Sequence, residues 1–234
     1  MYSLRERIAA YVPQDEQEAA DRLLMLQAID ELRAPLTRDN GFAHFTASSW
    51  IVNPDRTRVL MAWHNIYKTW AWTGGHADGE ADLLAVALRE AWEETGIGTI
   101  APVFRDIYSL EIVPVNAHFK NGAFVSAHLH MNVTYLLTAD DRQPLRVKPD
   151  ENSAVAWLPL GEAADNRDEP YMAVIYRKLN KKLVTIRSSP VNRDLSGKRR
   201  TSQSPSVTAP LKRGAKGLPV LPGSPPRGAV SEAD

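Results

Sequence analysis

Three glutamates near the middle of the sequence carry the clearest chemical signal. On a helical wheel with about 100° per residue, Glu93 and Glu94 lie about 60° and 40° to either side of Glu90. Like charges at this spacing destabilise a helix by a few tenths of a kcal/mol, and Arg89 offsets only part of the repulsion. This stripe of three glutamates on one helix face therefore indicates a site for a hard divalent ion such as Mg²⁺. Such an ion prefers oxygen ligands and completes its coordination with water and phosphate oxygens.

A glycine-rich segment, Thr73-Gly74-Gly75-His76-Ala77-Asp78-Gly79-Glu80, precedes this stripe. Glycine permits positive φ and lets the backbone approach a ligand closely. We therefore expect a loop here, in which Gly75 offers its carbonyl oxygen to the metal. A glycine-rich turn or a charged helix face has no functional meaning on its own, but the two together favour a metal site over a solvated helix face.

The stripe needs a helix to present it. Gly96 is placed to end such a helix in a left-handed cap, so we expect a helix from about residue 81 to 95. Its opposite face is apolar and anchors it through Leu84, Ala87, Leu88, Ala91 and Trp92.

Strand patterns rich in β-branched and aromatic residues flank this helix on both sides. Asn121-Gly122 is typical of a tight hairpin turn, and amphipathic spacing predicts further helices at 15–33 and 169–183, with a shorter one before Pro13. This order predicts an α+β domain with helices packed on the sheet faces. The expected strands are 43–51, 58–63, 103–115, 124–137 and 154–158.

Composition limits the chemistry and the partners. The 234 residues include no cysteine, which excludes disulfides, thiolate zinc sites and cysteine nucleophiles. The 28 basic and 28 acidic side chains balance, so overall charge selects neither nucleic acid nor membrane. The N-terminus is charged where a secretory peptide needs an apolar run, and no stretch approaches about 18 consecutive apolar residues. We therefore expect a cytoplasmic protein without a membrane span.

Three regions follow from these patterns. We expect residues 1–40 to form a helical extension packed on the core, 41–186 the main domain, and 187–234 a tail rich in Pro, Ser, Lys and Arg. The tail has too few large apolar residues to offset its ordering entropy, so we expect it to be disordered. Its basic runs, Lys198-Arg199-Arg200 and Lys212-Arg213, leave nucleic-acid contact open beside the simpler interpretation as a solvated extension.

Residues 75–97, GHADGEADLLAVALREAWEETGI, resemble the Nudix box, G-x5-E-x7-R-E-U-x-E-E-x-G-U, where U is a bulky apolar residue. The positions in register are Gly75, Arg89, Glu90, Glu93, Glu94, Gly96 and Ile97. Ala81 stands where the box has its first glutamate, and Ala91 is smaller than the usual apolar residue. Glu80, one residue early, or Asp78 is the candidate substitute for the missing carboxylate.

The resemblance implies a Nudix hydrolase with a mixed β-sheet between helices. Such an enzyme cuts a diphosphate linkage in a nucleoside diphosphate-X type substrate by attack of water at phosphorus, with Mg²⁺ as the metal and Mn²⁺ as a possible substitute. The family often has a carboxylate acting as base in the loop where this chain has Glu151. The implied metal ligands are Gly75, Glu90, Glu93 and Glu94. The implied catalytic residues are Glu93, Glu94, Glu90, Arg89 and Glu151.

Six further residues are candidates for substrate contacts, each with a structural alternative. Two of them, His128 and His130, alternate on a predicted strand and point to one face, which presents two imidazoles to a phosphate or a metal. The alternative is a pair of hydrogen-bonded structural histidines. The other four lie before the Nudix box or at its beginning. The structural alternative for these residues is an exposed hairpin end or a position in the core. The six are His64, Tyr67, Trp72, His76, His128 and His130.

Two other functions compete with hydrolysis. Isopentenyl diphosphate isomerases share the resemblance but need a catalytic cysteine, which this chain lacks. A non-catalytic Nudix-like module that binds nucleotides or partners is the second alternative, although such a module is expected to lose its carboxylates first. Nucleoside triphosphates, ADP-ribose, dinucleoside polyphosphates and capped RNA all present the same diphosphate to the box. A homodimer also stays open, since family members are often dimers.

Overall fold

The computed structural model describes residues 2–120, 122–165 and 169–188. The chain divides into two units, residues 1–191 and 192–234, and the second lies outside the described residues. The last helix runs to Ser188, so the start of the predicted tail at 187 falls within it, and the predicted disorder of the rest lies outside the described residues.

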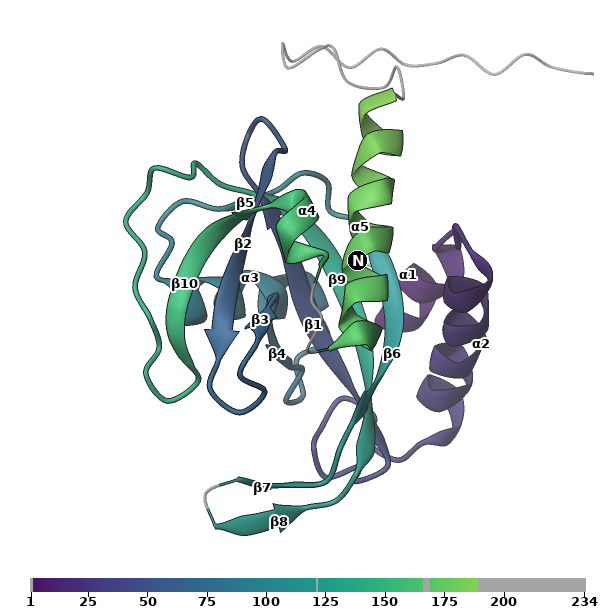
Figure 1. Ribbon diagram of the computed structural model, residues 1–234. Helices are drawn as coiled ribbons and strands as arrows, with labels where there is room; N and C mark the ends of the chain where they lie inside the picture. The colour runs from purple at the N-terminus through teal and green to yellow at the C-terminus, as the bar shows by residue number, and fades with distance from the viewer. Residues whose placement is uncertain (1, 121, 166–168, 189–234) are drawn as a thin grey trace, which may run out of the picture. The chain divides into compact units, whose positions relative to one another are not determined.

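A mixed β-sheet forms the centre of the first unit (Figure 1). Its strand order is β10-β2-β1-β9-β5, with β3 paired to β2, β4 to β1 and β6 to β9, and a separate hairpin of β7 and β8 extends beyond it. Strands β1 and β9 run parallel, whereas the other pairs are antiparallel. The strands are β1 (Ala43–Val52), β2 (Arg58–His64), β3 (Trp70–Ala71), β4 (Thr73–His76), β5 (Ala101–Pro102), β6 (Ser109–Val115), β7 (His118–Lys120), β8 (Ala123–Val125), β9 (His128–Thr138) and β10 (Asn152–Pro159).

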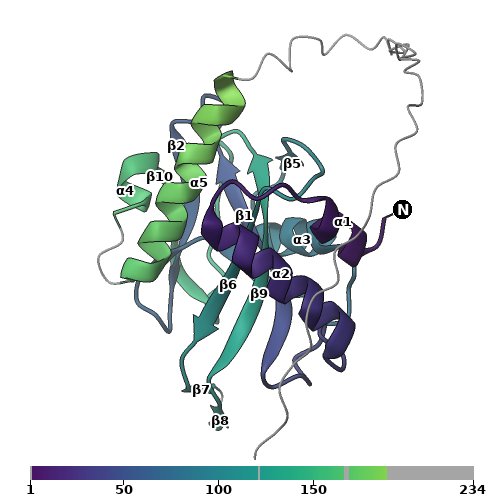
Figure 2. The same ribbon diagram turned by 90° about the vertical axis from the view of Figure 1, so that its right-hand side faces the viewer.

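Helices cover both faces of the sheet (Figure 2). One face packs against α3 and the N-terminal helices, and the other packs against α4 and α5. The predicted α+β fold, a sheet between helices, is therefore confirmed. The helices are α1 (Leu4–Ala10), α2 (Glu16–Glu31), α3 (Leu83–Thr95), α4 (Leu160–Ala163) and α5 (Pro170–Ser188).

Strand β1 lies between β9 and β4, and all ten of its residues are buried. Because successive side chains of a strand point to opposite faces, Phe45 and Ile51 join the core under α3, whereas Trp50 joins the core under α5. There Trp50 stacks on Tyr176, with ring centroids 5.2 Å apart. The central strand thus anchors the layers on both faces.

The N-terminal helices are fixed to this core by apolar contacts and by a buried ion pair. Ile8 and Met25 are fully buried in the core that includes α3. Glu18 of α2 is also fully buried, and its carboxylate lies 2.5 Å from Nζ of Lys182 on α5. The pair connects two helices that are far apart in the sequence.

Several predicted elements differ in the structure. The strand expected at 124–137 is split into β8, which ends at Val125, and β9, which begins at His128. The segment 73–80, expected to be a loop, begins with strand β4, which pairs with β1. The strand expected at 103–115 starts only at Ser109, because residues 104–107 bulge out between the hydrogen bonds that Val103 and Tyr108 donate to neighbouring carbonyls of β9. The bulge contacts α1, since Arg7 donates to the carbonyl of Arg105.

The hairpin expected around Asn121-Gly122 is present as β7 and β8. Gly122 has the positive φ of 80° that such a turn requires, whereas Asn121 lies outside the described residues. In residues 2–120, 122–165 and 169–188, none of the helices has both the length and the apolar character needed to cross a bilayer.

Candidate active site

Helix α3 presents the carboxylates as the wheel predicts. It begins at Leu83 because the side chain of Asp82 accepts hydrogen bonds from the N–H groups of Leu84 and Ala85, and it ends at Gly96 with φ 66°. Leu83, Leu84, Val86, Ala87 and Ala91 are buried against the sheet. The helix is therefore held from one side and leaves Arg89 and Glu93 partly exposed on the other.

Glu94 is the most enclosed of the three glutamates, with 7% of its surface exposed. Its Oε1 accepts a hydrogen bond of 2.8 Å from the N–H of Gly74 on β4. Burial raises the pKa of Glu94 to about 8, and the nearby charges of Glu151 and Glu90 act in the same direction. Such a carboxylate is costly to ionise unless a cation binds beside it.

Glu90 lies directly against the backbone of Gly75. A Cβ atom at Gly75 would stand 2.4 Å from Cδ of Glu90, so any other residue here must displace the Glu90 side chain. Burial raises the pKa of Glu90, as does Glu93, against the opposing effect of Arg89. The glycine of the box is thus required by the close approach of strand β4 to the carboxylate of α3.

Gly75→Ala is expected to lower turnover by about 10- to 100-fold, because the added methyl group displaces the Glu90 carboxylate from its place in the cluster. Melting temperature should change little, since the displaced group is the end of a flexible side chain. Steady-state kinetics and thermal unfolding check this, with Gly161→Ala, whose Cβ enters open space, as the matched control. Full activity in Gly75→Ala would contradict the requirement.

The loop before β10 brings a fourth carboxylate to the site. Nζ of Lys148 lies 3.3 Å from Glu93 and 3.0 Å from Glu151. Asn152 fixes the loop to the helix, since its Nδ2 donates to the carbonyl of Glu94. Burial disfavours the charged form of Lys148, but the hydrogen bonds and charges of Glu151 and Glu93 together outweigh it and raise its pKa. An ammonium group therefore lies among the carboxylates, where a cation is favoured.

The two candidate substitutes for the missing first box glutamate each have a partner outside the carboxylate cluster. Glu80 accepts a hydrogen bond from the N–H of Asp82, and Asp78 pairs with Arg38 at 2.6 Å. Arg89 instead lies 3.2 Å from Glu90 and 3.8 Å from Glu93. Arg89 is thus positioned by the glutamates of its own helix.

The candidate substrate residues fall into two groups. Nδ1 of His64 accepts from the N–H groups of Ile66 and Tyr67, and the rings of His64 and Tyr67 are 4.6 Å apart. This turn borders the loop of Glu151, because the N–H of Asn65 donates to the Glu151 carbonyl. Trp72 packs against Tyr176.

The second group lies on the sheet. His76, His128 and His130 lie together with His44, which sequence reasoning did not select. Sequence reasoning also missed Lys148 and Asn152. Two sequence features could have pointed to these residues. His44 alternates with polar residues along β1, and Lys148 lies three residues before Glu151.

The sequence matches the family model described as the NUDIX domain over residues 43–179. This match covers more than half of the chain, and the chain therefore belongs to the Nudix family. Nudix hydrolases generally use divalent metal ions. A comparison with curated proteins found no match.

Several solved structures are similar to this chain. A C. elegans Ap4A hydrolase is 18% identical, with 60% of this chain and 98% of that one covered and a TM-score of 0.46. The E. coli dihydroneopterin triphosphate pyrophosphohydrolase is 18% identical, with 61% and 95% covered and a TM-score of 0.45. A NUDIX family hydrolase from Clostridium perfringens is 20% identical, with 60% and 97% covered and a TM-score of 0.42. Similarity at this level assigns no substrate.

Proposed function

We propose that this chain is a metal-dependent pyrophosphohydrolase that cuts a diphosphate linkage in a nucleoside diphosphate-X type substrate. The observation that carries the proposal is the convergence of carboxylates from α3 and from the loop before β10 on the ammonium group of Lys148. Lys148 contacts Glu93 and Glu151, and its charge also acts on Glu90 and Glu94. The Lys148 ammonium group therefore marks a position where the carboxylates favour a positive charge.

The donor set fits Mg²⁺. Carboxylates and a backbone carbonyl are hard oxygen ligands, which Mg²⁺ prefers, and Mn²⁺ accepts the same ligands. Glu90, Glu93, Glu94 and the carbonyl of Gly75 would hold the ion. When bound, the ion screens the negative oxygens of the diphosphate and lowers the pKa of a coordinated water.

The residues of the chain then orient the reaction. The N–H of Gly74 fixes one carboxylate oxygen of Glu94, and Lys148 holds Glu151 beside Glu93. Glu151 takes the proton of the attacking water as general base. The water oxygen forms a bond to phosphorus, the bridging P–O bond breaks, and the leaving phosphate carries the electron pair away. Positioning and charge screening supply most of the rate enhancement.

Hydrolysis in oxygen-18 water is expected to place the label on one phosphate product and not on the protein, because water attacks phosphorus directly. Activity should be lost in chelator and return with Mg²⁺ or Mn²⁺. Mass spectrometry of products and protein provides the measurement. Label in a side-chain carboxylate, or full turnover without divalent metal, would overturn the mechanism.

The substrate is best found with a panel of nucleoside triphosphates, ADP-ribose, dinucleoside polyphosphates, nucleotide sugars and capped RNA, with products separated by chromatography. Binding of a panel member without turnover, in Mg²⁺ and in Mn²⁺, would favour the non-catalytic module instead.

The cytoplasmic location, the homodimer and the nucleic-acid contact of the basic tail stay predictions.

A further inference from the structure

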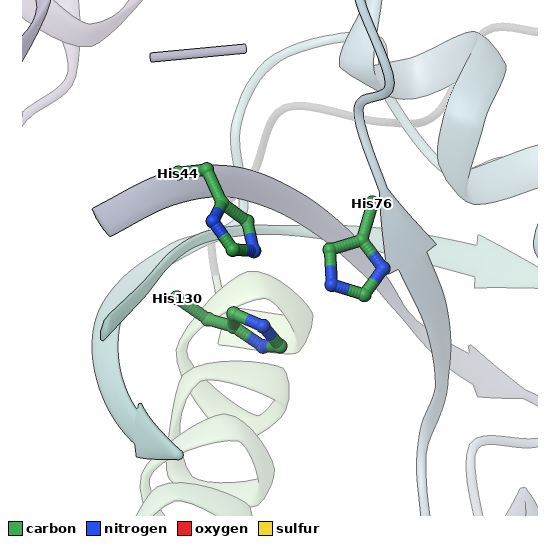
Figure 3. A group of neighbouring side chains, drawn as sticks. All are labelled: His44, His76 and His130. Carbon is green, nitrogen blue, oxygen red and sulfur yellow. The ribbon is translucent and has the colours of Figure 1, made fainter. Parts of the chain in front are cut away.

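Four histidines gather on one face of the sheet, away from the carboxylate cluster. His44 of β1 is the direct neighbour of His130 on β9, and His76 on β4 is opposite Thr46, two residues along β1. Paired residues on adjacent strands point to the same face. The imidazoles of His44, His76 and His130 therefore face one shared space (Figure 3). Gly75 precedes His76 on β4 and contacts Glu90, so alternation along the strand directs His76 to the opposite face.

The imidazole of His44 has one ring nitrogen, Nε2, that is buried and available to bind a ligand. It is only 4% exposed, and its Nδ1 lies 3.0 Å from the carbonyl of Asn40. Nδ1 therefore carries the proton and donates it to that carbonyl, which leaves a lone pair on Nε2. Nε2 is buried and has no hydrogen-bond partner among the described residues. A buried nitrogen lone pair without a donor is unfavourable, and a backbone carbonyl on the other nitrogen is the usual support of a metal-binding histidine.

The spacing of the three rings fits a single metal ion. One ligand nitrogen from each of His44, His76 and His130 lies within 4.8 Å of the other two. Ring centroids are 5.1 Å apart for His44 and His76, 5.1 Å for His44 and His130, and 4.9 Å for His76 and His130. Imidazoles that bind one ion at about 2.1 Å with tetrahedral angles have centroids roughly 5 Å apart. Nitrogens that share one tetrahedral ion at this distance are about 3.4 Å apart, so binding requires the rings to rotate until their nitrogens converge.

Burial favours the neutral form of His44 and His130, which is the form that binds metal. Burial lowers the pKa of His130 to about 2, and the neighbouring imidazoles of His76, His44 and His128 act in the same direction. Burial also lowers the pKa of His44. Nε2 of His128 lies 3.2 Å from Nε2 of His130, so a fourth imidazole is within reach.

We propose that His44, His76 and His130 bind one divalent transition-metal ion of the zinc class, at a site separate from the carboxylate cluster. Imidazole nitrogens suit Zn²⁺, Co²⁺ and Ni²⁺, whereas Mg²⁺ prefers oxygen. The bound ion links β1, β4 and β9 on the face opposite the contact between Gly75 and Glu90. The site stabilises the strand that carries the box glycine and takes no part in the proposed hydrolysis.

Metal binding to the tag-free, full-length protein tests this site. After removal of metal with a chelator, Zn²⁺ and Co²⁺ are titrated by calorimetry in millimolar Mg²⁺, which occupies the carboxylates. We expect one ion per chain with micromolar or tighter affinity, and visible Co²⁺ absorption typical of tetrahedral nitrogen coordination. At about 100-fold excess over Kd, Zn²⁺ should raise the melting temperature by about 5 to 10 °C.

Variants separate this site from the carboxylate cluster. His44→Gln, His76→Gln and His130→Gln should each weaken Zn²⁺ binding by at least about tenfold, whereas His64→Gln and Glu93→Gln should leave it within about threefold. Should the buried His44 variant fail to fold, the partly exposed His76 and His130 variants still decide the outcome. Absence of Zn²⁺ binding, or binding that survives the three histidine changes and is lost in Glu93→Gln, would overturn the proposal whether or not the protein hydrolyses a diphosphate.

Discussion

Glu93→Gln and Glu94→Gln are each expected to lower turnover by about 10²- to 10⁴-fold while the melting temperature holds or rises. Each change removes a proposed metal ligand. Glu93→Gln also removes one charge of the carboxylate cluster, and Glu94→Gln removes a buried carboxyl group that is costly to ionise. The gain in stability should be larger for Glu94, because it is almost fully buried and has a pKa raised to about 8. Steady-state kinetics with Mg²⁺ and thermal unfolding in chelator measure the two effects separately.

Glu80→Gln is the matched control, since Glu80 belongs to the same box but is exposed, and its carboxylate accepts a hydrogen bond from the N–H of Asp82. We expect its turnover to stay within about threefold of the parent. Activity that falls in step with unfolding in the Glu93 and Glu94 variants would mean that these glutamates have a structural role only. Equal losses in Glu80→Gln would identify it as the substitute for the box glutamate missing at Ala81.

The part of the site within α3 could be predicted because helical periodicity is local. Glu90, Glu93 and Glu94 share a face whatever the rest of the chain does. The helix starts two residues later than expected, at Leu83, because Asp82 caps it from outside the helix. Glu151 came from the family resemblance rather than from any pattern of its own.

Strand β4 could not be predicted, because glycine is depleted in strands and Gly74 and Gly75 therefore indicated a loop. In the structure both glycines pair with β1. A Cβ at Gly74 would stand 2.5 Å from Oγ of Ser48 and 2.6 Å from the Ala47 carbonyl. The glycines are needed for close packing, and this reason becomes visible only when the neighbouring strand is known.

The histidine cluster depends on pairing between distant strands. The alternation of His128 with His130 predicts a shared face, and the sequence shows the same alternation at His44 and Thr46. Thr46 and its hydrogen-bond partner Asn132 are 86 residues apart, and no local pattern sets the parallel register of β1 and β9. The contribution of His44 therefore required the structure.

Glu18→Leu is expected to lower the free energy of unfolding by about 3 to 5 kcal/mol, the cost of leaving one partner of a buried ion pair without the other. The Glu18 carboxylate is fully buried, lies 2.5 Å from Nζ of Lys182, and accepts 2.7 Å hydrogen bonds from the hydroxyls of Tyr11 and Ser109. Chemical denaturation measures the loss. Asp30→Asn, which breaks the exposed pair of Arg5 and Asp30, should cost far less, because solvent screens both charges.

The pH dependence gives a second measure of the same contact. Burial disfavours ionisation of Glu18, but the hydrogen bond and charge of Lys182 outweigh it and lower its pKa from the ordinary 4.5 to about 2. A depressed pKa stabilises the folded state above about pH 4.5, and this contribution is lost as the pH falls toward 2. The difference in stability between the parent and Glu18→Leu should therefore shrink over this range. A constant difference would mean that the loss comes from packing alone.

The double variant Glu18→Leu/Lys182→Met distinguishes the cost of an unpaired charge from the value of the pair. Because Lys182 is only 5% exposed, its ammonium group is left without its main partner in Glu18→Leu, and replacing it by methionine removes that penalty. We expect the double variant to recover at least half of the stability lost in Glu18→Leu, since Lys178 retains its ion pair with Glu111 at 2.9 Å. If the two changes were additive instead, the pair would contribute no coupling, and α2 would be held on the core by its apolar contacts and by its other hydrogen bonds, such as those of Gln17 and Asp21 to β6.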